Sequence, residues 1–148
     1  MAELCQRSGV QLLTYGTLCG GLLSERYLGR PEPGRGELVT ASLQKYKRMI
    51  DAWGGWELFQ QLLGTLERVA DKHEVSVANV AVRAILDRPA VAGVIVGARL
   101  GLSDHLEDNR WVFALRLDPE DGARIDAVLK DSHDLFGIIG DCGDEYRG

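Results

Sequence analysis

Residues 91–96 constrain the fold most strongly, because they read Val-Ala-Gly-Val-Ile-Val without a single polar side chain. A strand with one face in water alternates apolar and polar residues, whereas a parallel strand covered on both faces is apolar throughout. Gly97 follows and ends the run. We therefore expect residues 91–96 to form a parallel strand that is covered on both faces.

A second strand is expected at residues 10–15, which are rich in strand-forming types and run into Gly16, with Gly20 and Gly21 soon after. Helical patterns separate the two segments, and this order is typical of parallel βα units. Two parallel strands alone leave their edges unpaired and their apolar faces uncovered, which is a poor free-standing fold. The sequence therefore looks like an α/β portion of a larger sheet or barrel.

Helices are expected where apolar residues recur with helical spacing between end signals. Ser42, Ser76 and Asp118 are candidate N-terminal caps, and Pro119 suits a first helical position. Residues 24–38 carry prolines and glycines among charges and form a long surface loop, a candidate lid. The expected helices cover residues 2–7, 42–53, 56–70, 76–86 and 103–113, and another starts at 118.

Composition excludes several function classes. The formal net charge of −5 opposes binding to nucleic acid, and no apolar run approaches the roughly 20 residues that a membrane span needs. Cys5, Cys19 and Cys142 are an odd number at unrelated spacings, which favours a reducing compartment and hence the cytoplasm. Neither the cysteines nor the three histidines have the spacing of a zinc site, so no metal is expected.

Three segments resemble a known family. Residues 15–27 (YGTLCGGLLSERY) resemble the seventh strand and following loop of aldo-keto reductases. Residues 94–99 (VIVGAR), running to 105–109 (HLEDN), resemble the eighth strand and the helix that closes over the adenosine end of the cofactor. Residues 76–83 (SVANVAVR) resemble the helix before that strand, so the resemblance covers essentially the whole chain.

The resemblance implies an α/β fold class, namely the C-terminal portion of a (β/α)8 TIM barrel with about two barrel strands, so that the barrel is incomplete. Residues 1–148 would then be a partial NADP-dependent oxidoreductase domain, with residues 138–148 as a C-terminal tail. Active sites of this fold lie at the C-terminal ends of the strands. Both loops that follow the two expected strands would lie on that rim.

For the first segment, the resemblance implies contacts with the nicotinamide and pyrophosphate of NADP(H). Tyr15 would stack on the nicotinamide, although from position alone it would more readily pack on the barrel core. Arg26 would bind the pyrophosphate with its guanidinium, although alone it reads equally as a solvated surface arginine. Backbone N–H groups near the pyrophosphate would come from the glycine-rich loop, at Gly16, Leu18, Gly20 and Gly21.

For the second segment, the resemblance implies an adenosine site made of Gly97, Arg99, His105, Asp108 and Asn109. Arg99 would bind the 2′-phosphate that distinguishes NADP from NAD. Asp108 and Asn109 would hydrogen-bond the adenine edge. His105 departs from the Arg or Gln that is frequent there.

Two further departures lie in the first half of the chain. Gly16 replaces the usual serine, which removes a hydroxyl near the phosphates. Thr40 falls where some members of the family place another phosphate-binding arginine.

Catalysis in the family uses an Asp, a Tyr, a Lys and a His on earlier strands, where the tyrosine donates a proton to the carbonyl oxygen. None of these is carried over to this sequence. Tyr46 has Lys45 and Lys47 beside it, but adjacent residues on a helix point apart, so we interpret them as a solvated helix face.

Two functions follow from the resemblance. In the first, a full-length parent reduces a small-molecule aldehyde or ketone by hydride transfer from NADPH, and this chain is its truncated cofactor-binding part, inactive alone. In the second, the chain is a non-catalytic NADP(H)-binding or barrel-completing module that associates with another chain through exposed strand edges. Neither involves nucleic acid or a membrane.

Overall fold

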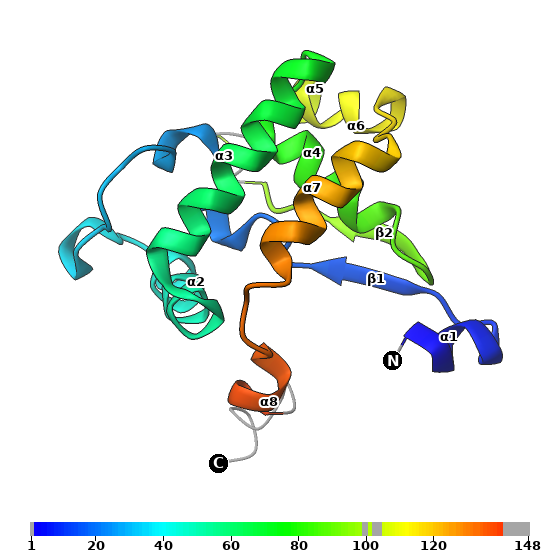
Figure 1. Cartoon of the computed structure of the whole chain (residues 1–148), viewed down its shortest axis with the longest axis horizontal. Helices are drawn as coiled ribbons and strands as arrows, with labels where there is room; N and C mark the ends of the chain where they lie inside the picture. Colours follow the sequence, from blue (N-terminus) through cyan, green and yellow to red (C-terminus); the bar gives the residue numbers. More distant parts are fainter. Residues whose placement is uncertain (1, 99–100, 102–104, 141–148) are drawn as a thin grey trace.

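The structure, a computed structural model, describes residues 2–98, 101 and 105–140, which are mostly helical around a two-stranded parallel sheet (Figure 1). No helix among these residues is long and apolar enough to cross a membrane. Short 3-10 turns lie at Cys19–Gly21 (η1), Glu25–Tyr27 (η2) and Arg35–Glu37 (η3). The strands are β1 (Leu12–Tyr15) and β2 (Val91–Ile95), and the helices are α1 (Ala2–Ser8), α2 (Ala41–Trp53), α3 (Gly55–His73), α4 (Val77–Leu86), α5 (Leu106–Asn109), α6 (Trp111–Ala114), α7 (Pro119–Leu129) and α8 (Leu135–Ile139).

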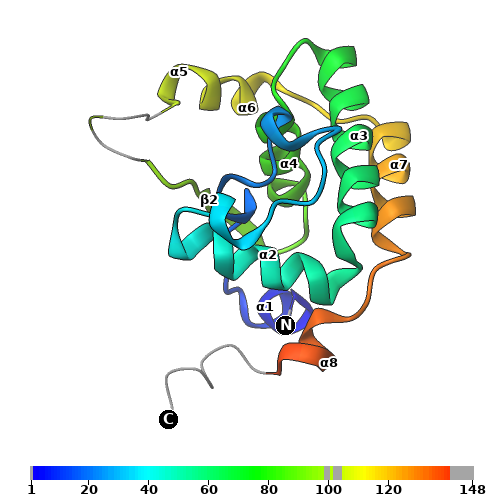
Figure 2. The same cartoon turned by 90° about the vertical axis from the view of Figure 1, so that its left-hand side faces the viewer.

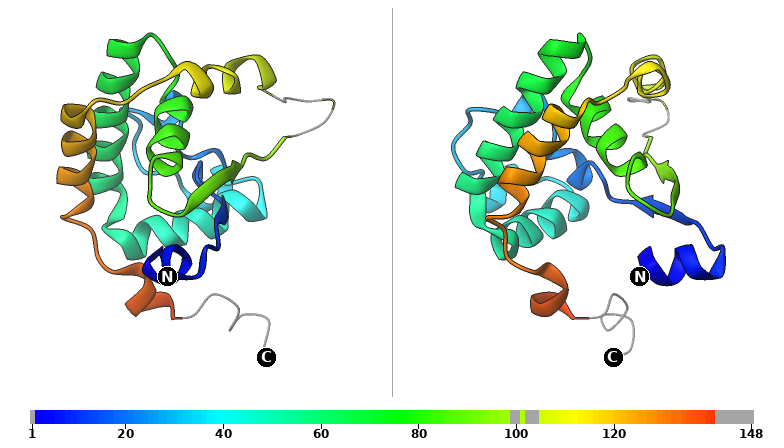
Figure 3. Two further views of the ribbon diagram at one scale, coloured as in Figure 1. Left: turned by 90° about the vertical axis from the view of Figure 1, so that its right-hand side faces the viewer. Right: turned by 45° about the vertical axis from the view of Figure 1, so that its right-hand side comes forward.

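The two strands pair in parallel, as the sequence predicts, with Leu13 beside Gly93 and Tyr15 beside Ile95. The prediction that β2 is covered on both faces is wrong for this chain. Leu13, Tyr15 and Ile95 share one face and are 67%, 74% and 57% exposed. Helix α4 packs against β2 (Figure 3), but none of the described elements buries this face.

Helix α3 lies at the centre of the core, packed against α2, α4 and α7 (Figure 2). Its predicted apolar face is confirmed, since every one of the apolar residues that define it is buried. Each Leu, Val or Phe side chain of this face contributes roughly 1.5–3 kcal/mol when fully buried. The buried residues of this face are Leu58, Phe59, Leu62, Leu63, Leu66, Val69 and Ala70.

Two of the three predicted helix caps are confirmed. The Ser76 hydroxyl accepts a hydrogen bond from the Asn79 N–H at 3.1 Å, and the Asp118 carboxylate accepts two from the first turn of α7. The prediction for Ser42 is wrong, because Thr40 has the extended backbone of a cap and its hydroxyl accepts from the Leu43 N–H at 3.1 Å.

The helix expected over residues 103–113 is present as two short helices, α5 and α6, on either side of Arg110. Its expected start at Ser103 lies outside the described residues.

The long loop over residues 24–38 is fastened to α3. The Trp56 indole donates a hydrogen bond to the Arg30 carbonyl at 2.9 Å. The Gln60 amide donates to the Tyr27 carbonyl at 3.0 Å and accepts from the Gly29 N–H at 2.8 Å. A lid built from this loop would have to break these bonds to move.

Lys47 fastens the same loop to α2. Its ammonium lies 2.6 Å from the Glu32 carboxylate and 2.5 Å from that of Asp51, and the residue is only 7% exposed. Burial lowers the pKa of Lys47, but the hydrogen bonds that its ammonium donates to both carboxylates outweigh burial and raise that pKa overall. The interpretation of Lys47 as part of a solvated face is therefore wrong, because the loop folds back over α2.

A buried carboxylate joins the end of α3 to the start of α7. Asp121 is 1% exposed, and its oxygens lie 2.8 Å from the Lys72 ammonium and 2.7 Å from the His73 ring nitrogen. The Asp118 N–H also donates to it at 3.1 Å. Burial raises the pKa of Asp121, but these hydrogen bonds dominate and lower it to about 2.

Replacing Asp121 tests this junction. Because its pKa in the folded chain is lowered, the carboxylate stabilises the fold at neutral pH and loses this effect as the pH falls from about 3.8 to about 2. We expect Asp121→Asn to lower the free energy of unfolding by about 1–3 kcal/mol at pH 7 and to flatten its acid dependence.

Urea unfolding at pH values from 7 to 2 measures both effects. Asp126 lies on the same helix as Asp121 and forms a half-exposed ion pair with Arg88, which follows α4. Asp126→Asn is therefore the matched control and should cost about 1 kcal/mol or less. Equal costs for the two variants would contradict the assignment.

Candidate functional site

The parallel pairing brings the two predicted cofactor segments to one edge of the sheet. Tyr15 and Ile95 are partners at the C-terminal ends of β1 and β2. The loop that begins at Gly16 and the loop that begins at Val96 therefore leave from the same edge. This edge is the rim at which parallel α/β folds place their ligands.

Tyr15 lies at this rim on the uncovered face of the sheet. With 74% of its surface exposed, its ring is no part of the core formed by the described residues. A flat, accessible ring at a strand end is suited to stacking on an aromatic ligand.

The glycines of the following loop have a structural reason that does not involve a ligand. Gly16 and Gly20 have φ values of +75° and +65°, which favour glycine. A Cβ atom on Gly16 would lie 2.2 Å from the Tyr46 hydroxyl oxygen, and one on Gly20 would lie 2.6 Å from the Ser42 hydroxyl oxygen. A side chain at Gly16 or Gly20 would therefore force Tyr46 or Ser42 of α2 to shift.

Several backbone groups of this loop are already bonded internally. The Gly21 N–H donates to the Leu18 carbonyl at 2.8 Å, and the Cys19 N–H donates to the Gly16 carbonyl at 2.9 Å. A phosphate at the Gly21 amide would have to replace the first of these bonds. The predicted phosphate contact at Gly21 therefore carries a cost that the sequence does not reveal.

Arg26 is an exposed cation whose neighbours in the chain, Glu25 and Tyr27, contact other elements. Its guanidinium carbon lies 5.6 Å from the centroid of the Tyr27 ring, which packs edge-on against the ring of Trp56 at 6.3 Å. The preceding residue, Glu25, accepts a hydrogen bond from the Val77 N–H at 2.6 Å. Within the described part of the chain, Arg26 forms no ion pair, so its charge is available to an anion.

Among the predicted adenosine residues, Asp108 contacts the first turn of α4. Its carboxylate accepts hydrogen bonds from the Ser76 hydroxyl at 2.8 Å and the Asn79 amide at 3.0 Å. Sequence reasoning missed Asn79, although a polar residue within the apolar run of α4 is a usable signal. Asn109 is half-buried beside Asp108.

Two other predicted adenosine residues, His105 and Gly97, are exposed. His105 is exposed and has a left-handed φ of +52°, and its carbonyl accepts from the Asn109 N–H at 2.9 Å. Gly97 is exposed just beyond β2. The predicted 2′-phosphate ligand, Arg99, lies outside the described residues.

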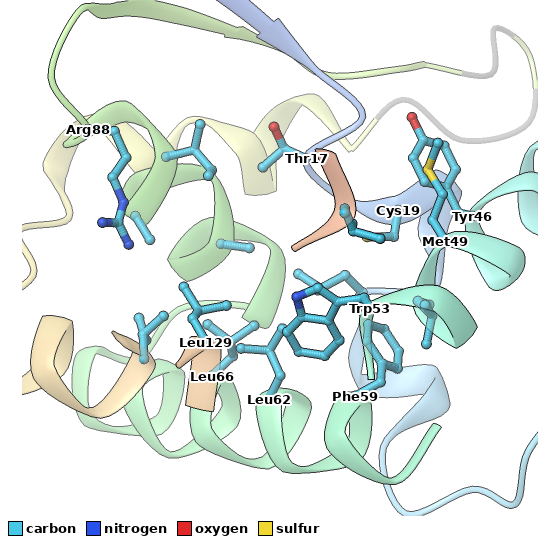
Figure 4. A pocket seen from close by; sticks show the side chains of 17 residues that line it. Thr17, Cys19, Tyr46, Met49, Trp53, Phe59, Leu62, Leu66, Arg88 and Leu129 are labelled. Carbon is cyan, nitrogen blue, oxygen red and sulfur yellow. The ribbon is translucent and has the colours of Figure 1, made fainter. Parts of the chain in front are cut away.

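An apolar pocket of about 320 Å³ lies between α4 and the helices α2, α3 and α7, next to the loop that follows β1 (Figure 4). Trp53 and Phe59 line one side, and Cys19 and Tyr46 line the other. Tyr46 is half-buried and contacts the loop, so interpreting it as part of a solvated face is also wrong. Burial raises the pKa of the Cys19 thiol to about 11, which makes it a poor nucleophile at neutral pH.

Two groups that line this pocket, the Cys19 thiol and the Tyr46 hydroxyl, are held in their protonated forms at neutral pH. Tyr46 has its pKa raised, chiefly by burial, so it is less acidic than an ordinary tyrosine. No cluster of three or more Cys, His, Asp or Glu side chains suited to a metal is present among residues 2–98, 101 and 105–140. What the rim offers is an exposed ring, an unpaired guanidinium and polar groups on α5.

Comparison with known proteins relates the chain to a family and to a flagellar protein. The family model described as "Aldo/keto reductase family" matches residues 1–130. The chain is also 37% identical over 87 residues to flagellar radial spoke protein 5 of Chlamydomonas reinhardtii. That match covers 57% of this chain and 16% of the relative, so the chain spans a small part of the relative's length.

The close approach of Tyr46 to Gly16 is testable by substitution. Gly9 has a similar φ of +65° but nothing within 4 Å of an added Cβ, so Gly9→Ala measures backbone strain alone, about 1–2 kcal/mol. Gly16→Ala adds a steric overlap, and we expect it to cost about 1–3 kcal/mol more.

Denaturant unfolding of both variants, repeated in a Tyr46→Phe background, measures these costs. Removing the hydroxyl should reduce the cost of Gly16→Ala and leave that of Gly9→Ala unchanged. Equal costs in all backgrounds would show that α2 does not restrict the loop.

Proposed function

Because the chain belongs to the aldo/keto reductase family, we propose that it is the cofactor-binding C-terminal part of an NADP-dependent reductase of aldehydes or ketones. Membership of this family supports an oxidoreductase-type function. We further propose that the cofactor is NADP(H), that the chain forms part of a (β/α)8 barrel, and that the rest of the parent protein carries the catalytic residues.

The observation that carries the proposal is the uncovered apolar face of the sheet. Each strand of a (β/α)8 barrel has helices on its outer face and packs into the barrel interior with its other face. Here α4 packs against β2 on one side, and Leu13, Tyr15 and Ile95 lie bare on the other. The bare face is what two strands taken from such a barrel would present.

The residues at the rim suit the proposed cofactor in part. Tyr15 would stack on the nicotinamide, and Arg26 would pair with the pyrophosphate. Asn109 and Gly97 would border the adenosine, and Arg99 would bind the 2′-phosphate. Against this fit, the Gly21 amide already donates a hydrogen bond within the loop. Gly16 and Gly20 are assigned chiefly to the shape of the loop, because Tyr46 and Ser42 of α2 lie close to them.

When bound, NADPH supplies the hydride that a carbonyl carbon accepts, while a separate acid protonates the oxygen. The residues described here would hold and orient the cofactor, and we assign none of them as that acid. We therefore propose that the chain is inactive alone and that the parent supplies the proton donor and the substrate pocket. The free cysteines, Cys5 buried and Cys19 half-buried, are compatible with a reducing compartment such as the cytoplasm.

A second function is favoured by the same bare face. A non-catalytic module that completes a barrel with another chain would use both the apolar face and the open edges of β1 and β2. This module would be a monomer only at low concentration. Sedimentation equilibrium across a range of concentrations distinguishes a stable monomer from such an associating chain.

A titration with NADPH tests the cofactor assignment. We expect weak binding by this chain, because half of the pocket is supplied by the rest of the barrel, with NMR shifts confined to the rim segments 15–26 and 97–109. Arg26→Ala should weaken this binding by about tenfold or more, since it removes a charge-assisted hydrogen bond to phosphate.

Arg124→Ala, which removes an exposed cation on α7 outside both segments, is the matched control and should leave binding unchanged. Tight binding by a monomer, or binding that is indifferent to Arg26, would contradict the proposal.

A further inference from the structure

Two carboxylates from different cofactor segments meet at the first turn of α4. Glu25 comes from the segment that follows β1, and Asp108 comes from the segment that follows β2. They are separated by more than eighty residues in the sequence, yet both bond to the turn that starts at Ser76. The first turn of α4 is thus hydrogen-bonded by a side chain from each of the two segments.

The contact with Glu25 fixes the first segment. Its carboxylate accepts from the Val77 N–H at 2.6 Å, one of the N–H groups that a helix leaves without an internal partner. The positive end of the helix dipole favours a carboxylate at this position. Glu25 precedes Arg26 directly, so this bond sets where the Arg26 backbone lies.

The contact with Asp108 fixes the second segment. One carboxylate oxygen accepts from the Ser76 hydroxyl at 2.8 Å, and the other accepts from the Asn79 amide nitrogen at 3.0 Å. A carboxylate only accepts hydrogen bonds, so the amide nitrogen of Asn79 must face it. The same nitrogen donates to the Ser76 hydroxyl at 2.8 Å, so the three side chains are hydrogen-bonded to one another.

The turn itself is anchored in the core. Asn79 and Val77 are each 1% exposed, and Val80 is fully buried. Because α4 packs on both α3 and β2, the turn moves only if the core moves. A rigid turn that holds one residue of each segment determines the separation between them.

We propose that the first turn of α4 is the joint that sets the separation of the pyrophosphate and adenosine segments, with Asn79 as its positioning residue. The proposal rests on the proposed function, since it names what holds the same site together. Asp108 acts through the joint by holding α5, and its neighbour Asn109 is thereby fixed at the rim.

Exchanging the two partners of the joint tests it. Asn79→Asp keeps a residue that suits a helix start but places a carboxylate against that of Asp108, on the same turn whose Val77 N–H bonds Glu25, so the joint should open. The double variant Asn79→Asp with Asp108→Asn restores an amide facing a carboxylate and the original net charge. A misfolded protein would not be rescued by the second substitution, so rescue by the double variant distinguishes loss of the joint from general misfolding.

Hydrogen exchange of backbone amides provides a readout without nucleotide. The probes are the N–H groups of Tyr27 and Leu28 in the first segment and of Asn109 in the second, each of which is hydrogen-bonded. We expect Asn79→Asp to speed exchange in both segments by about tenfold or more, with α3 unchanged, and the double variant to restore most of the protection. Faster exchange in only one segment, or no rescue, would overturn the joint.

NADPH titration of the original chain and of Asn79→Asp then relates the joint to binding. Asn79→Asp should weaken nucleotide binding in parallel with its loss of amide protection. If the original chain binds no NADPH while exchange behaves as expected, the proposed function fails and the joint stands. If nucleotide binds normally to Asn79→Asp despite faster exchange, the positioning role is overturned.

Discussion

Parallel pairing of β1 with β2 determines both the core and the site of this chain. Parallel strands cannot be joined by a tight turn, so the chain must cross over between them, and the crossover here contains α2, α3 and α4. Those helices make most of the hydrophobic core. The same pairing aligns the ends of the strands, so that the loops after Tyr15 and Ile95 leave from one edge. Packing and binding geometry therefore have a common origin.

Sequence reasoning succeeded where the signal is local. The caps at Ser76 and Asp118, the apolar face of α3 and the parallel strand at residues 91–96 all follow from patterns within about fifteen residues. It failed where the chain returns on itself. Lys47 is buried because the loop carrying Glu32 folds over α2, and no periodicity in α2 contains that information. Thr40 and Ser42 are both acceptable caps locally, and the extended backbone at Thr40 decides between them.

The site illustrates a different limit, which is that one residue type serves two purposes. Glycines that approach a phosphate and glycines that approach a neighbouring helix have the same sequence signature. At Gly16 and Gly20 the structure provides the second reason, in Tyr46 and Ser42. Asp108 is similarly ambiguous, because a carboxylate suited to an adenine edge is here bonded to Ser76 and Asn79. The resemblance placed these residues at the rim, but it did not reveal what else they hold.

The mismatch between the sequence of β2 and its surroundings is itself informative. A strand that is apolar on both faces is adapted to burial on both, and Ile95 nevertheless lies 57% exposed, beside a Tyr15 that is 74% exposed. Two strands are too few to be stable without cover. In the closed barrel that we propose for the parent protein, this face would pack against the other strands, and the ring of Tyr15 would lie at the mouth. The bare face therefore connects stability with function, because whatever covers Leu13 and Ile95 also completes the rim around Tyr15.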